Sequence, residues 1–460
     1  MLTVGARDRW QDGRREFLKR RLHLRVDQRH PAHHSPDEER FGGDVEKKRG
    51  LFQGLACLHA DRAFDAGRFG GGLKILGQEV AADSFHGLAD PAVFFWVVLP
   101  EVVMSIDSHL RYISPFDAMK ALRLIEPGKF EFFQAPEPVP PQPGEALVRV
   151  LRTGICGTDL HAYRGKQPFF TYPRILGHEL GVEVLALGAG AESAAVAPGD
   201  VCCVEPFLNC GKCPACRRGK TNCCESLKTL GVHIDGAMQE RYVLPAHKLH
   251  KPASALRPEQ LATVEPLCIG SHAVWRAQPE HGDSLLVIGA GPIGLAVVEA
   301  ARALGIDPVM MEVSTSRLAF CEQQVKLRTV DARRDAKEQL RGLLGGELPR
   351  VVVDCTGNKQ SMESCFELVA HGGKVVFVGI HLGDLSFYNP NYHAREITLM
   401  SSRNATAEDF RRVLDNLATG KSSSDYWLAG STAPEDVPAE FPKWLDVEAG
   451  LIKPVINWEA

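Results

Sequence analysis

The chain has 460 residues, enough for two or three domains, and its 44% hydrophobic and 24% charged content is that of an ordinary globular protein. A formal net charge of −4 without a long basic run argues against a nucleic-acid partner. The longest apolar run, residues 91–104, is interrupted and too short to cross a membrane. The 13 cysteines cluster at metal-like spacings and follow no signal peptide, which predicts a reducing, cytoplasmic location.

Residues 1–117 differ in composition from the rest of the chain. They are crowded with Arg, His, Asp and Gly, and apart from one apolar run they lack the periodicity of buried strands or helices. Such a segment buries too little apolar surface to offset the entropy of ordering. We therefore expect a disordered, dispensable extension or a mis-assigned start, with Met119 as the true first residue. The histidines His30, His33 and His34 fit a solvated arm better than a metal site.

From Met119 the sequence alternates in the manner of short β-strands. The pattern begins at 119–130, continues at 145–153 after a Pro-rich turn, and recurs at 180–187 and 201–205. Glycine and proline turns separate these segments. This texture is typical of a small β-rich domain.

A loop-rich stretch between two of these strands carries the first group of metal-ligand side chains. It contains Cys156, His178 and Glu179, which supply a thiolate, an imidazole and a carboxylate, all ligands that zinc accepts. Thr158 and His161 lie between them, and a hydroxyl with an imidazole can pass a proton outward. The alternative interpretation is a turn-rich loop that holds a buried cysteine and a satisfied histidine.

A cysteine-rich lobe, residues 209–224, carries the most specific metal motif. Four of its cysteines have the spacing C-x2-C-x2-C-x7-C and can close a tetrahedral zinc shell with no open position, which indicates a structural site. These cysteines are Cys210, Cys213, Cys216 and Cys224. Cys223 is a neighbouring alternative for the fourth ligand, and disulfide pairing is the competing hypothesis.

From residue 283 the pattern changes to alternating strands and helices. A buried strand at 284–288 runs into the turn G-A-G-P-I-G and then a helix. In such a turn Gly289 permits the tight bend, Gly291 lets the backbone approach a pyrophosphate, and Gly294 allows close helix packing. The residues predicted to hold a dinucleotide are Gly289, Gly291, Pro292, Ile293, Gly294, Glu312 and Arg317.

Glu312, at the end of the second strand of this region, bears on which dinucleotide is bound. A carboxylate there accepts hydrogen bonds from the adenosine ribose and repels a 2′-phosphate, so NAD is expected rather than NADP. An ordinary surface glutamate is the alternative. After further strand–helix alternation, residues 403–460 revert to polar helices and a last short strand, K-P-V-I-N-W.

In combination, these motifs resemble the zinc-dependent medium-chain dehydrogenases/reductases, the group of alcohol, sorbitol and threonine dehydrogenases. The resemblance runs from Met119 to the end of the chain and is carried by G-I-C-G-T-D-L-H, G-H-E, the cysteine lobe, V-E-P-L and G-A-G-P-I-G. It implies an α/β protein with a GroES-like catalytic domain at 118–264, a Rossmann domain at 265–402 and a return to the catalytic domain at 403–460. Hydride would pass from a secondary hydroxyl to NAD.

The resemblance also implies the surroundings of a catalytic zinc. Cys156 and His178 match zinc ligands, and Glu179 matches a residue that is a ligand or alternates with water. Glu265, in V-E-P-L, stands where polyol dehydrogenases place a glutamate ligand. Asp159 matches a carboxylate that orients the zinc-bound histidine.

Thr158 and His161 match the proton relay of the family, and the family implies one catalytic zinc, one structural zinc and a homo-oligomer, either dimer or tetramer. One position departs from the family pattern. Three residues after the glutamate of G-H-E the family usually has glycine, whereas this chain has Val182, with Gly181 beside it. This departure questions the local strand packing and not the ligands.

Within the family, the sequence looks most like sugar-acid dehydrogenases of the L-galactonate 5-dehydrogenase type, which implies L-galactonate or L-gulonate as substrate. The similar segments are G-K-Q-P-F-F-T-Y-P-R-I-L-G-H-E, G-K-T-N-C-C-E, L-G-V-H-x-D-G and S-R-N-A-T-x-E-D-F. A sugar acid needs a cation for its carboxylate, and Arg174 and Arg403 are the guanidiniums in these segments.

Each arginine also has an ordinary interpretation, since Arg174 fits a surface residue and Arg403 fits a contact to the cofactor or to the zinc-site carboxylates. L-threonine 3-dehydrogenase and sorbitol or polyol dehydrogenase are the alternative enzymes. A non-catalytic NAD-binding protein is the alternative from another class.

Overall fold

The structure, a computed structural model, describes residues 118–460 except 169, 447 and 449, together with four short strands nearer the N-terminus. The chain divides into two units, Met1–Phe95 and Trp96–Ala460. The short strands form two antiparallel pairs, β1 (Leu73–Ile75) with β2 (Gln78–Val80) and β3 (Val98–Leu99) with β4 (Val102–Val103). Most of residues 1–117, and with them the expectations of an extension or a mis-assigned start, lie outside the described residues.

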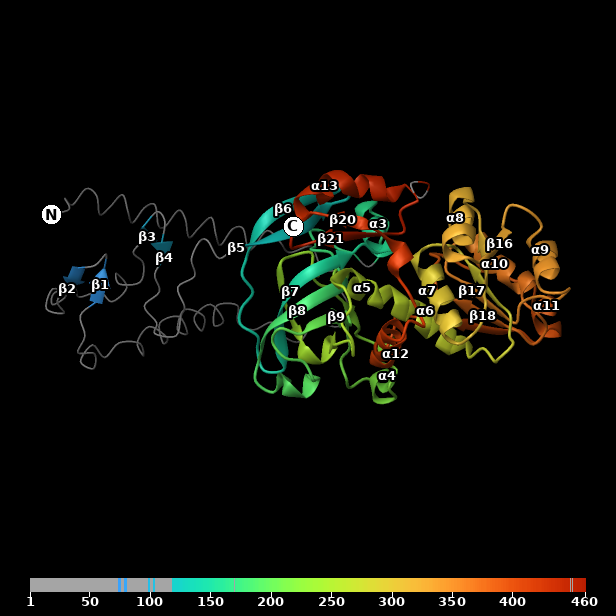
Figure 1. Cartoon of the computed structure of the whole chain (residues 1–460), viewed down its shortest axis with the longest axis horizontal. Coiled ribbons are helices and arrows are strands. Elements are labelled where there is room, and N and C mark those ends of the chain that lie inside the picture. The colour runs from blue at the N-terminus through green and yellow to red at the C-terminus, as the bar shows by residue number, and fades with distance from the viewer. Residues whose placement is uncertain are drawn as a thin grey trace, which may run out of the picture. The chain divides into compact units, whose positions relative to one another are not determined.

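A seven-stranded sheet forms the first domain of the second unit (Figure 1). Its strands are β7 (Glu145–Gly154), β8 (Glu179–Leu187), β9 (Val201–Val204), β12 (Arg241–Pro245), β13 (Leu249–His250), β20 (Leu428–Thr432) and β21 (Lys453–Asn457). The order is β13-β9-β8-β7-β21-β20, and β12 also pairs with β7. Both partners fit on one edge of β7, because β12 pairs with its first five residues and β21 with its last three. The C-terminal strand therefore closes on a strand far earlier in the chain.

The alternation in the sequence explains how β7 packs. Ala146, Val148 and Val150 are buried in the core, whereas Arg149 between the last two is exposed, as expected for a strand with one face covered. Two strand pairs form separate small sheets, β5 (Ala118–Glu126) with β6 (Lys129–Pro136), and β10 (Phe207–Leu208) with β11 (Lys228–Thr229).

Position 182 in β8, where the family usually has glycine, is Val182 in this chain, and Gly181 beside it provides the space. Val182 is fully buried in the core. A Cβ placed on Gly181 would lie 2.5 Å from the carbonyl oxygen of Pro258, so it is Gly181 that permits the close approach of helix α5 (Pro258–Ala262) to β8. The strand packs without a glycine at position 182.

A parallel six-stranded sheet forms the second domain. Its strands are β14 (Leu285–Ile288), β15 (Val309–Glu312), β16 (Arg328–Asp331), β17 (Val351–Asp354), β18 (Lys374–Phe377) and β19 (Thr398–Ser401). The order β16-β15-β14-β17-β18-β19 corresponds to 3-2-1-4-5-6, the doubly wound arrangement of dinucleotide-binding domains. The central strands β14, β15 and β17 are buried at every residue, because helices cover both faces of the sheet. The predicted doubly wound parallel sheet is confirmed.

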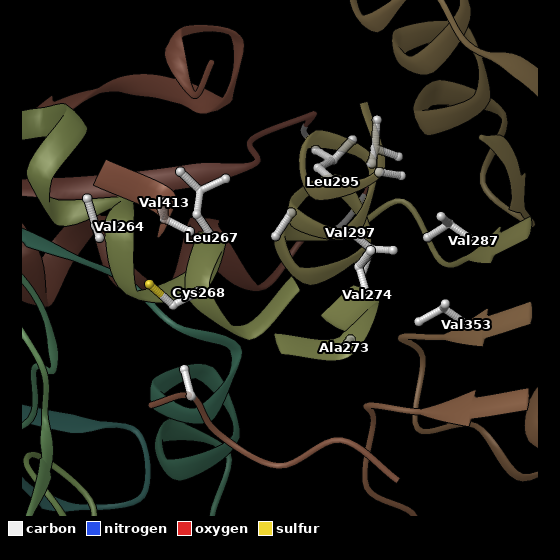
Figure 2. Close-up of a cluster of buried hydrophobic side chains, with 14 of the residues drawn as sticks. Val264, Leu267, Cys268, Ala273, Val274, Val287, Leu295, Val297, Val353 and Val413 are labelled. Carbon is white, nitrogen blue, oxygen red and sulfur yellow. The ribbon is translucent and has the colours of Figure 1, made fainter. Parts of the chain in front are cut away.

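Helix α6 (Val264–Ala277) contacts both domains. It touches β8 and β9 of the first sheet, and β18, β19 and helix α7 (Pro292–Ala303) of the second domain. One buried apolar cluster continues through it, from Leu267 in α6 to Val297 in α7 and Val287 in β14 (Figure 2). The helix is therefore embedded in a common core and is not a loose connection.

The other helices are shorter or lie at the periphery, and no helix in the described part of the chain is long and apolar enough to span a membrane. They are α3 (Gly157–Tyr163), α4 (Pro214–Arg217), α8 (Thr315–Phe320), α9 (Ala336–Leu343), α10 (Lys359–Leu368), α11 (Asn389–Ala394), α12 (Ala407–Ala418) and α13 (Val437–Glu440), with the π-turn η7 (Cys321–Val325) and the 3₁₀ turns η4 (Ala191–Ala194), η5 (Thr221–Cys223), η6 (Ala246–Lys248), η8 (Asp425–Trp427), η9 (Pro434–Asp436) and η10 (Phe441–Leu445).

Candidate active site

The candidate catalytic ligands lie where β7 ends and β8 begins. Gly154, the last residue of β7, is the register partner of Glu179, the first residue of β8. A Cβ on Gly154 would lie 2.4 Å from Glu179 Oε2, so only glycine leaves room for the carboxylate. Cys156 follows as the N-cap of α3, and its Sγ accepts a hydrogen bond from the Thr158 amide at 3.4 Å. The sheet register thus brings a thiol and a carboxylate together.

Three of the predicted ligands form one group. The ligand atoms of Cys156, His178 and Glu179 all lie within 4.8 Å of one another, with His178 and Glu179 buried and Cys156 half-buried. Among the described residues Glu265 does not belong to this group, although it is buried in the first turn of α6 and interacts electrostatically with His178.

Charges in this pocket favour a bound cation. Burial raises the pKa of Asp159 to about 6 and the pKa of Glu265 to about 7, each carboxylate being further opposed by Glu179. Burial alone would lower the pKa of His178, but Cys156, Asp159 and Glu265 together raise it well above its usual value. The pocket therefore gathers carboxyl and thiol donors around His178, and such donors can bind a divalent metal.

Two unpaired atoms support the same conclusion. His178 Nδ1 and Asp159 Oδ1 are buried without hydrogen-bond partners, 4.0 Å apart, while Asp159 Oδ2 accepts the Cys156 amide at 2.9 Å. Asp159 thus holds the backbone of Cys156 and faces one nitrogen of His178. A thiolate, an imidazole and a carboxylate supported in this way fit zinc.

Lys453, which lies outside every motif of the sequence, is the central cation of the pocket. Its Nζ donates to both carboxylate oxygens of Glu179 at 2.7 Å and to the Ile155 carbonyl at 3.0 Å. Lys453 and Glu179 are each only 1% exposed. The sequence signal was a lysine at the start of an otherwise apolar C-terminal strand, K-P-V-I-N-W, since lysine is almost never fully buried unless it is paired.

The predicted proton relay lies on α3. Thr158 and His161 are three residues apart, so they share a face of the helix. Burial, together with Arg164 and Lys166, lowers the pKa of His161 below its usual value, so this imidazole is neutral at pH 7 and able to accept a proton.

The cysteine lobe brings its four sulfurs together. The Sγ atoms of Cys210, Cys213, Cys216 and Cys224 lie within 4.8 Å of one another, whereas Cys223 is exposed and outside the group. Backbone amides donate to the sulfurs, for example Cys210 N to Cys224 Sγ at 3.2 Å. Backbone amides, chiefly that of Lys212, also lower the pKa of the Cys210 thiol to about 6. Backbone amides thus favour the thiolate at Cys210 and Cys213, whereas burial raises the pKa of the Cys216 thiol to about 11. The grouping of the four sulfurs fits a closed zinc shell. All cysteines in the described residues are free, which leaves the disulfide hypothesis without support.

The glycine-rich turn has the geometry predicted for its three glycines. Gly289 has a left-handed φ of +98°, which favours glycine. A Cβ on Gly294 would lie 1.8 Å from the Gly289 carbonyl oxygen, so the start of α7 packs directly on the strand end. A Cβ placed on Gly291 would meet only one atom within 4 Å, Arg317 Nη1 at 3.5 Å, so the space in front of Gly291 is open. An open backbone face beside a guanidinium fits a pyrophosphate.

Glu312 is fixed in place by backbone amides. Its Oε2 accepts from Ala290 N at 2.8 Å, and its Oε1 accepts from Val313 N at 2.7 Å and Ser314 N at 3.0 Å. Since a carboxylate can accept about four hydrogen bonds, one acceptor position remains for a ribose hydroxyl.

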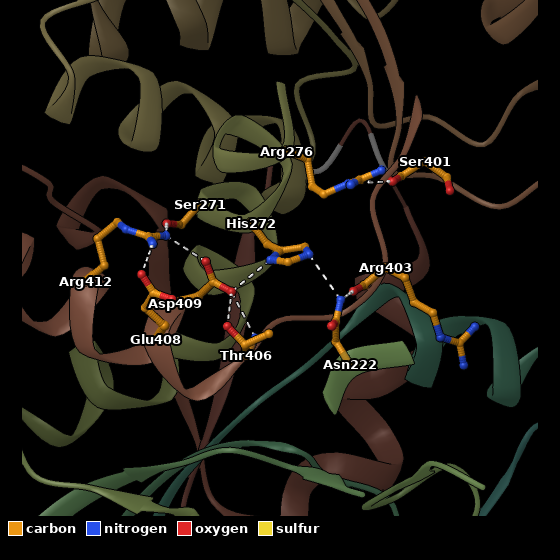
Figure 3. A network of polar contacts seen from close by, with 10 residues as sticks. All are labelled: Asn222, Ser271, His272, Arg276, Ser401, Arg403, Thr406, Glu408, Asp409 and Arg412. Atoms are coloured by element: carbon orange, nitrogen blue, oxygen red, sulfur yellow. Dashed lines mark hydrogen bonds and ion pairs between the residues drawn. The ribbon is translucent and has the colours of Figure 1, made fainter. Parts of the chain in front are cut away.

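The two candidate substrate arginines differ in their surroundings. Arg174 Nη2 donates to Thr171 Oγ1 at 2.6 Å, and Arg174 Nη1 lies 3.4 Å from Asp235. Arg403 is exposed, and among the described residues its guanidinium makes no ion pair; Figure 3 shows it pointing away from the contacts around it. The pKa of the His233 imidazole is lowered, chiefly by burial and further by the positive charges of Arg403 and Arg174.

His233 was missed as a candidate, although its motif, L-G-V-H-x-D-G, is among the similar segments. Its loop packs on the residue before His178, because a Cβ on Gly236 would lie 2.4 Å from the Gly177 carbonyl oxygen. The Thr229 amide donates to His233 Nδ1 at 3.1 Å, which places the proton of a neutral ring on Nε2. Three basic side chains thus gather next to the zinc-ligand strand.

Comparisons with known proteins decide the family. The Alcohol dehydrogenase GroES-like domain family matches residues 142–254, and the Zinc-binding dehydrogenase family matches residues 292–419. The L-galactonate-5-dehydrogenase of Escherichia coli K12 is 41% identical over 311 residues, which cover 67% of this chain and 90% of that relative. The chain belongs to the zinc-dependent medium-chain dehydrogenases. The predicted family, its GroES-like and Rossmann fold, and a zinc-containing, NAD-dependent dehydrogenase activity are thereby confirmed.

Two solved structures support the fold and the cofactor of this dehydrogenase. RspB from Escherichia coli CFT073, complexed with NADH, has a TM-score of 0.69 at 27% identity and covers 74% of this chain and 100% of that chain. A protein of Sinorhizobium meliloti described as a zinc-binding dehydrogenase and bound to NADP has a TM-score of 0.68 at 28% identity. The match covers 74% of this chain and 99% of that chain. Zinc and NAD(H) are thus the cofactors of the group, while the roles of single residues stay predictions.

Proposed function

We propose that this dehydrogenase oxidises a secondary hydroxyl of a sugar acid such as L-galactonate or L-gulonate, with NAD as the hydride acceptor. The observation that carries the proposal is the basic flank formed by Arg174, His233 and Arg403, next to the strand of the zinc ligands. A polyol needs only neutral partners, whereas a hexonate brings a carboxylate that a guanidinium can bind through two hydrogen bonds. The 41% identity to an L-galactonate-5-dehydrogenase supports the same substrate class.

Arg403 is the better candidate for the carboxylate. Arg174 already donates to Thr171 and faces Asp235, so much of its donor capacity is used within the protein. The guanidinium of Arg403 has no such partner in the described part of the chain and is exposed to solvent.

The chain's own residues supply positioning and the proton path. Zinc, held by Cys156 and His178 with Glu179 beside them, would act as a Lewis acid on the substrate hydroxyl. Thr158 Oγ1 would take the hydroxyl proton, and the proton would leave towards the neutral imidazole of His161, which lies one turn along α3. Bound NAD⁺ would supply the hydride acceptor, so that alcohol and NAD⁺ would give a carbonyl compound, NADH and one proton.

Replacement of Arg403 by alanine tests the substrate class. We expect kcat/KM for L-galactonate to fall by about 10–100-fold, because a charge-assisted hydrogen bond is lost, while oxidation of galactitol, which lacks the carboxylate, changes little. Arg403→Lys should lose less, since it keeps the charge. Arg411→Ala is the matched control, because Arg411 is an exposed arginine of α12 with the same charge. Higher activity on sorbitol or L-threonine than on every hexonate would contradict the proposal.

Preference for NAD over NADP is predicted to depend on Glu312. Its carboxylate is fixed by three backbone amides, so it cannot swing away from a 2′-phosphate. We expect Glu312→Ala to raise KM for NAD, because a ribose partner is lost, and to lower KM for NADP, because the repulsion of the 2′-phosphate is removed. Steady-state kinetics with both cofactors measure this, and equal efficiency of the unmodified enzyme with NAD and NADP would refute it.

The cellular location and the oligomeric state of the enzyme are also part of the proposal. The free cysteines of the described part fit a reducing, cytoplasmic compartment, in which thiols are available to bind zinc. We also propose a homo-oligomer, either a dimer or a tetramer, and light scattering of the purified enzyme would distinguish these from a monomer.

A further inference from the structure

A buried chain of polar contacts joins the four-cysteine lobe to helices α6 and α12 (Figure 3). Asn222 Nδ2 lies 3.1 Å from His272 Nε2, and His272 Nδ1 lies 2.8 Å from Asp409 Oδ2. Their exposed fractions are 2%, 3% and 1%, so water does not compete for these contacts. Asn222 belongs to η5 in the lobe, His272 to α6 and Asp409 to the first turn of α12. These polar contacts therefore connect three elements that are distant in sequence.

The hydrogen-bond partners of His272 determine which of its ring nitrogens carries the proton. Although burial opposes it, hydrogen bonds from His272 and Thr406 lower the pKa of Asp409, so its carboxylate is ionised and accepts the Nδ1 proton of His272. Nε2 is then an acceptor and receives Asn222 Nδ2, which also donates to the Arg403 carbonyl at 2.8 Å. Asp409 also pairs with Arg412 at 2.7 Å and accepts from Thr406, so it keeps partners without His272. Removal of Asn222, in contrast, leaves the buried Nε2 of His272 unpaired, which costs more than the bond itself contributed.

Asn222 depends on the lobe for its position. It lies between two of the candidate structural ligands, Cys216 and Cys224, in the 3₁₀ turn that ends next to Cys224. A zinc that closes the lobe would fix this turn, and with it the amide that faces His272.

Helix α6 transmits its position to the nucleotide-binding helix. A Cβ on Gly270 would lie 2.3 Å from the backbone carbon of Ala296 and 2.5 Å from Val297 N, so α6 and α7 are in backbone contact. Apolar side chains of both helices, among them Val274 of α6 and Leu295 of α7, belong to one buried cluster (Figure 2). Two helices packed this closely move together, because neither can slide without a clash.

The pair of helices α6 and α7 carries candidate functional residues at the start of each helix. Helix α7 begins directly after Gly291, in the turn that fits the pyrophosphate, and α6 carries Glu265 in its first turn. His272 lies two turns along α6 from Glu265, on the part of the helix that the lobe and α12 hold.

We propose that Asn222 and His272 are positioning residues through which the four-cysteine lobe sets the place of α6 and thereby of the dinucleotide turn. The lobe then contributes to NAD affinity as well as to stability. Both residues act through α6 and not through contact with the reacting groups.

Dinucleotide binding to the zinc-loaded enzyme tests the proposal. We expect Asn222→Ala and His272→Ala each to raise the dissociation constant of NADH, measured by fluorescence titration, by about 3–10-fold. The double variant should be no weaker than the weaker single variant, because both changes break one link. Metal analysis should still find both zinc ions, and kcat at saturating NAD should stay within about twofold of the parent, since the reacting groups are untouched.

Two further variants complete the test. Lys220→Ala is the matched control, because Lys220 lies on the same lobe, 4.6 Å over the Trp275 ring of α6, but forms only an exposed contact; its NADH affinity should equal that of the parent. Asn222→Ser keeps a donor and should fall between the parent and Asn222→Ala, which leaves a readout if His272→Ala does not fold. Variants that lower the melting temperature but bind NADH like the parent would overturn the proposal.

Discussion

The Lys453→Met variant is expected to lose about 3–5 kcal/mol of unfolding free energy, because it removes one partner of a buried ion pair. Lys453 Nζ holds both oxygens of Glu179 at 2.7 Å, and both residues are fully buried. Without the lysine, the carboxylate of Glu179 stays buried beside Cys156 and loses the ammonium group that holds both of its oxygens, so turnover should fall as well. Urea denaturation of the variant and the parent measures the stability difference.

A double change separates charge imbalance from lost packing. In Lys453→Met/Glu179→Gln both charges are absent, so most of the lost stability should return, because replacing both partners of a buried pair is far less costly than replacing one. Lys443→Met is the control: Lys443 pairs with Glu440 at 2.6 Å on the surface, where such a pair contributes at most about 1 kcal/mol. A Lys453→Met protein as stable as this control would show that the buried pair does not hold the pocket.

The fold was predictable where local sequence and tertiary structure agree. The run L-L-V-I followed by G-A-G-P-I-G permits little besides a buried strand and a tight turn into a helix, and Gly289 and Gly294 occupy the two places where a side chain cannot fit. Alternation likewise located β7. The pairing of β7 with both β12 and β21 was not predictable in this way, because strand order depends on contacts between segments distant in sequence.

The same distinction applies to the site. Cys156, His178 and Glu179 carry their chemistry in short motifs, and the structure brings them together. Lys453 and His272 carry no motif, since each acts on a partner more than one hundred residues away, Glu179 and Asp409 respectively. Only a burial pattern distinguishes such residues in a sequence: a lysine or histidine at a position where the strand or helix faces the core.

Zinc analysis of two cysteine variants is expected to separate the catalytic from the structural site. Two zinc ions per chain are predicted for the parent. Cys156→Ala should lose one zinc and lower turnover by ~10³-fold or more, because Lewis-acid stabilisation of several kcal/mol disappears, while its melting temperature changes little. Cys156 lies at the half-exposed N-cap of a seven-residue helix, so the surrounding sheet does not depend on it.

Cys213→Ala should lose the other zinc and much of the stability of the lobe. Its sulfur lies in the group of four, and the lobe has only the two-residue strands β10 and β11 and short helical turns to hold it without metal. Cys223→Ala is the matched control, because Cys223 is exposed beside Cys224 and outside the group, and it should keep both zinc ions and full activity. If Cys156→Ala and Cys213→Ala lost activity and stability in equal measure, the assignment of one catalytic and one structural zinc would be wrong.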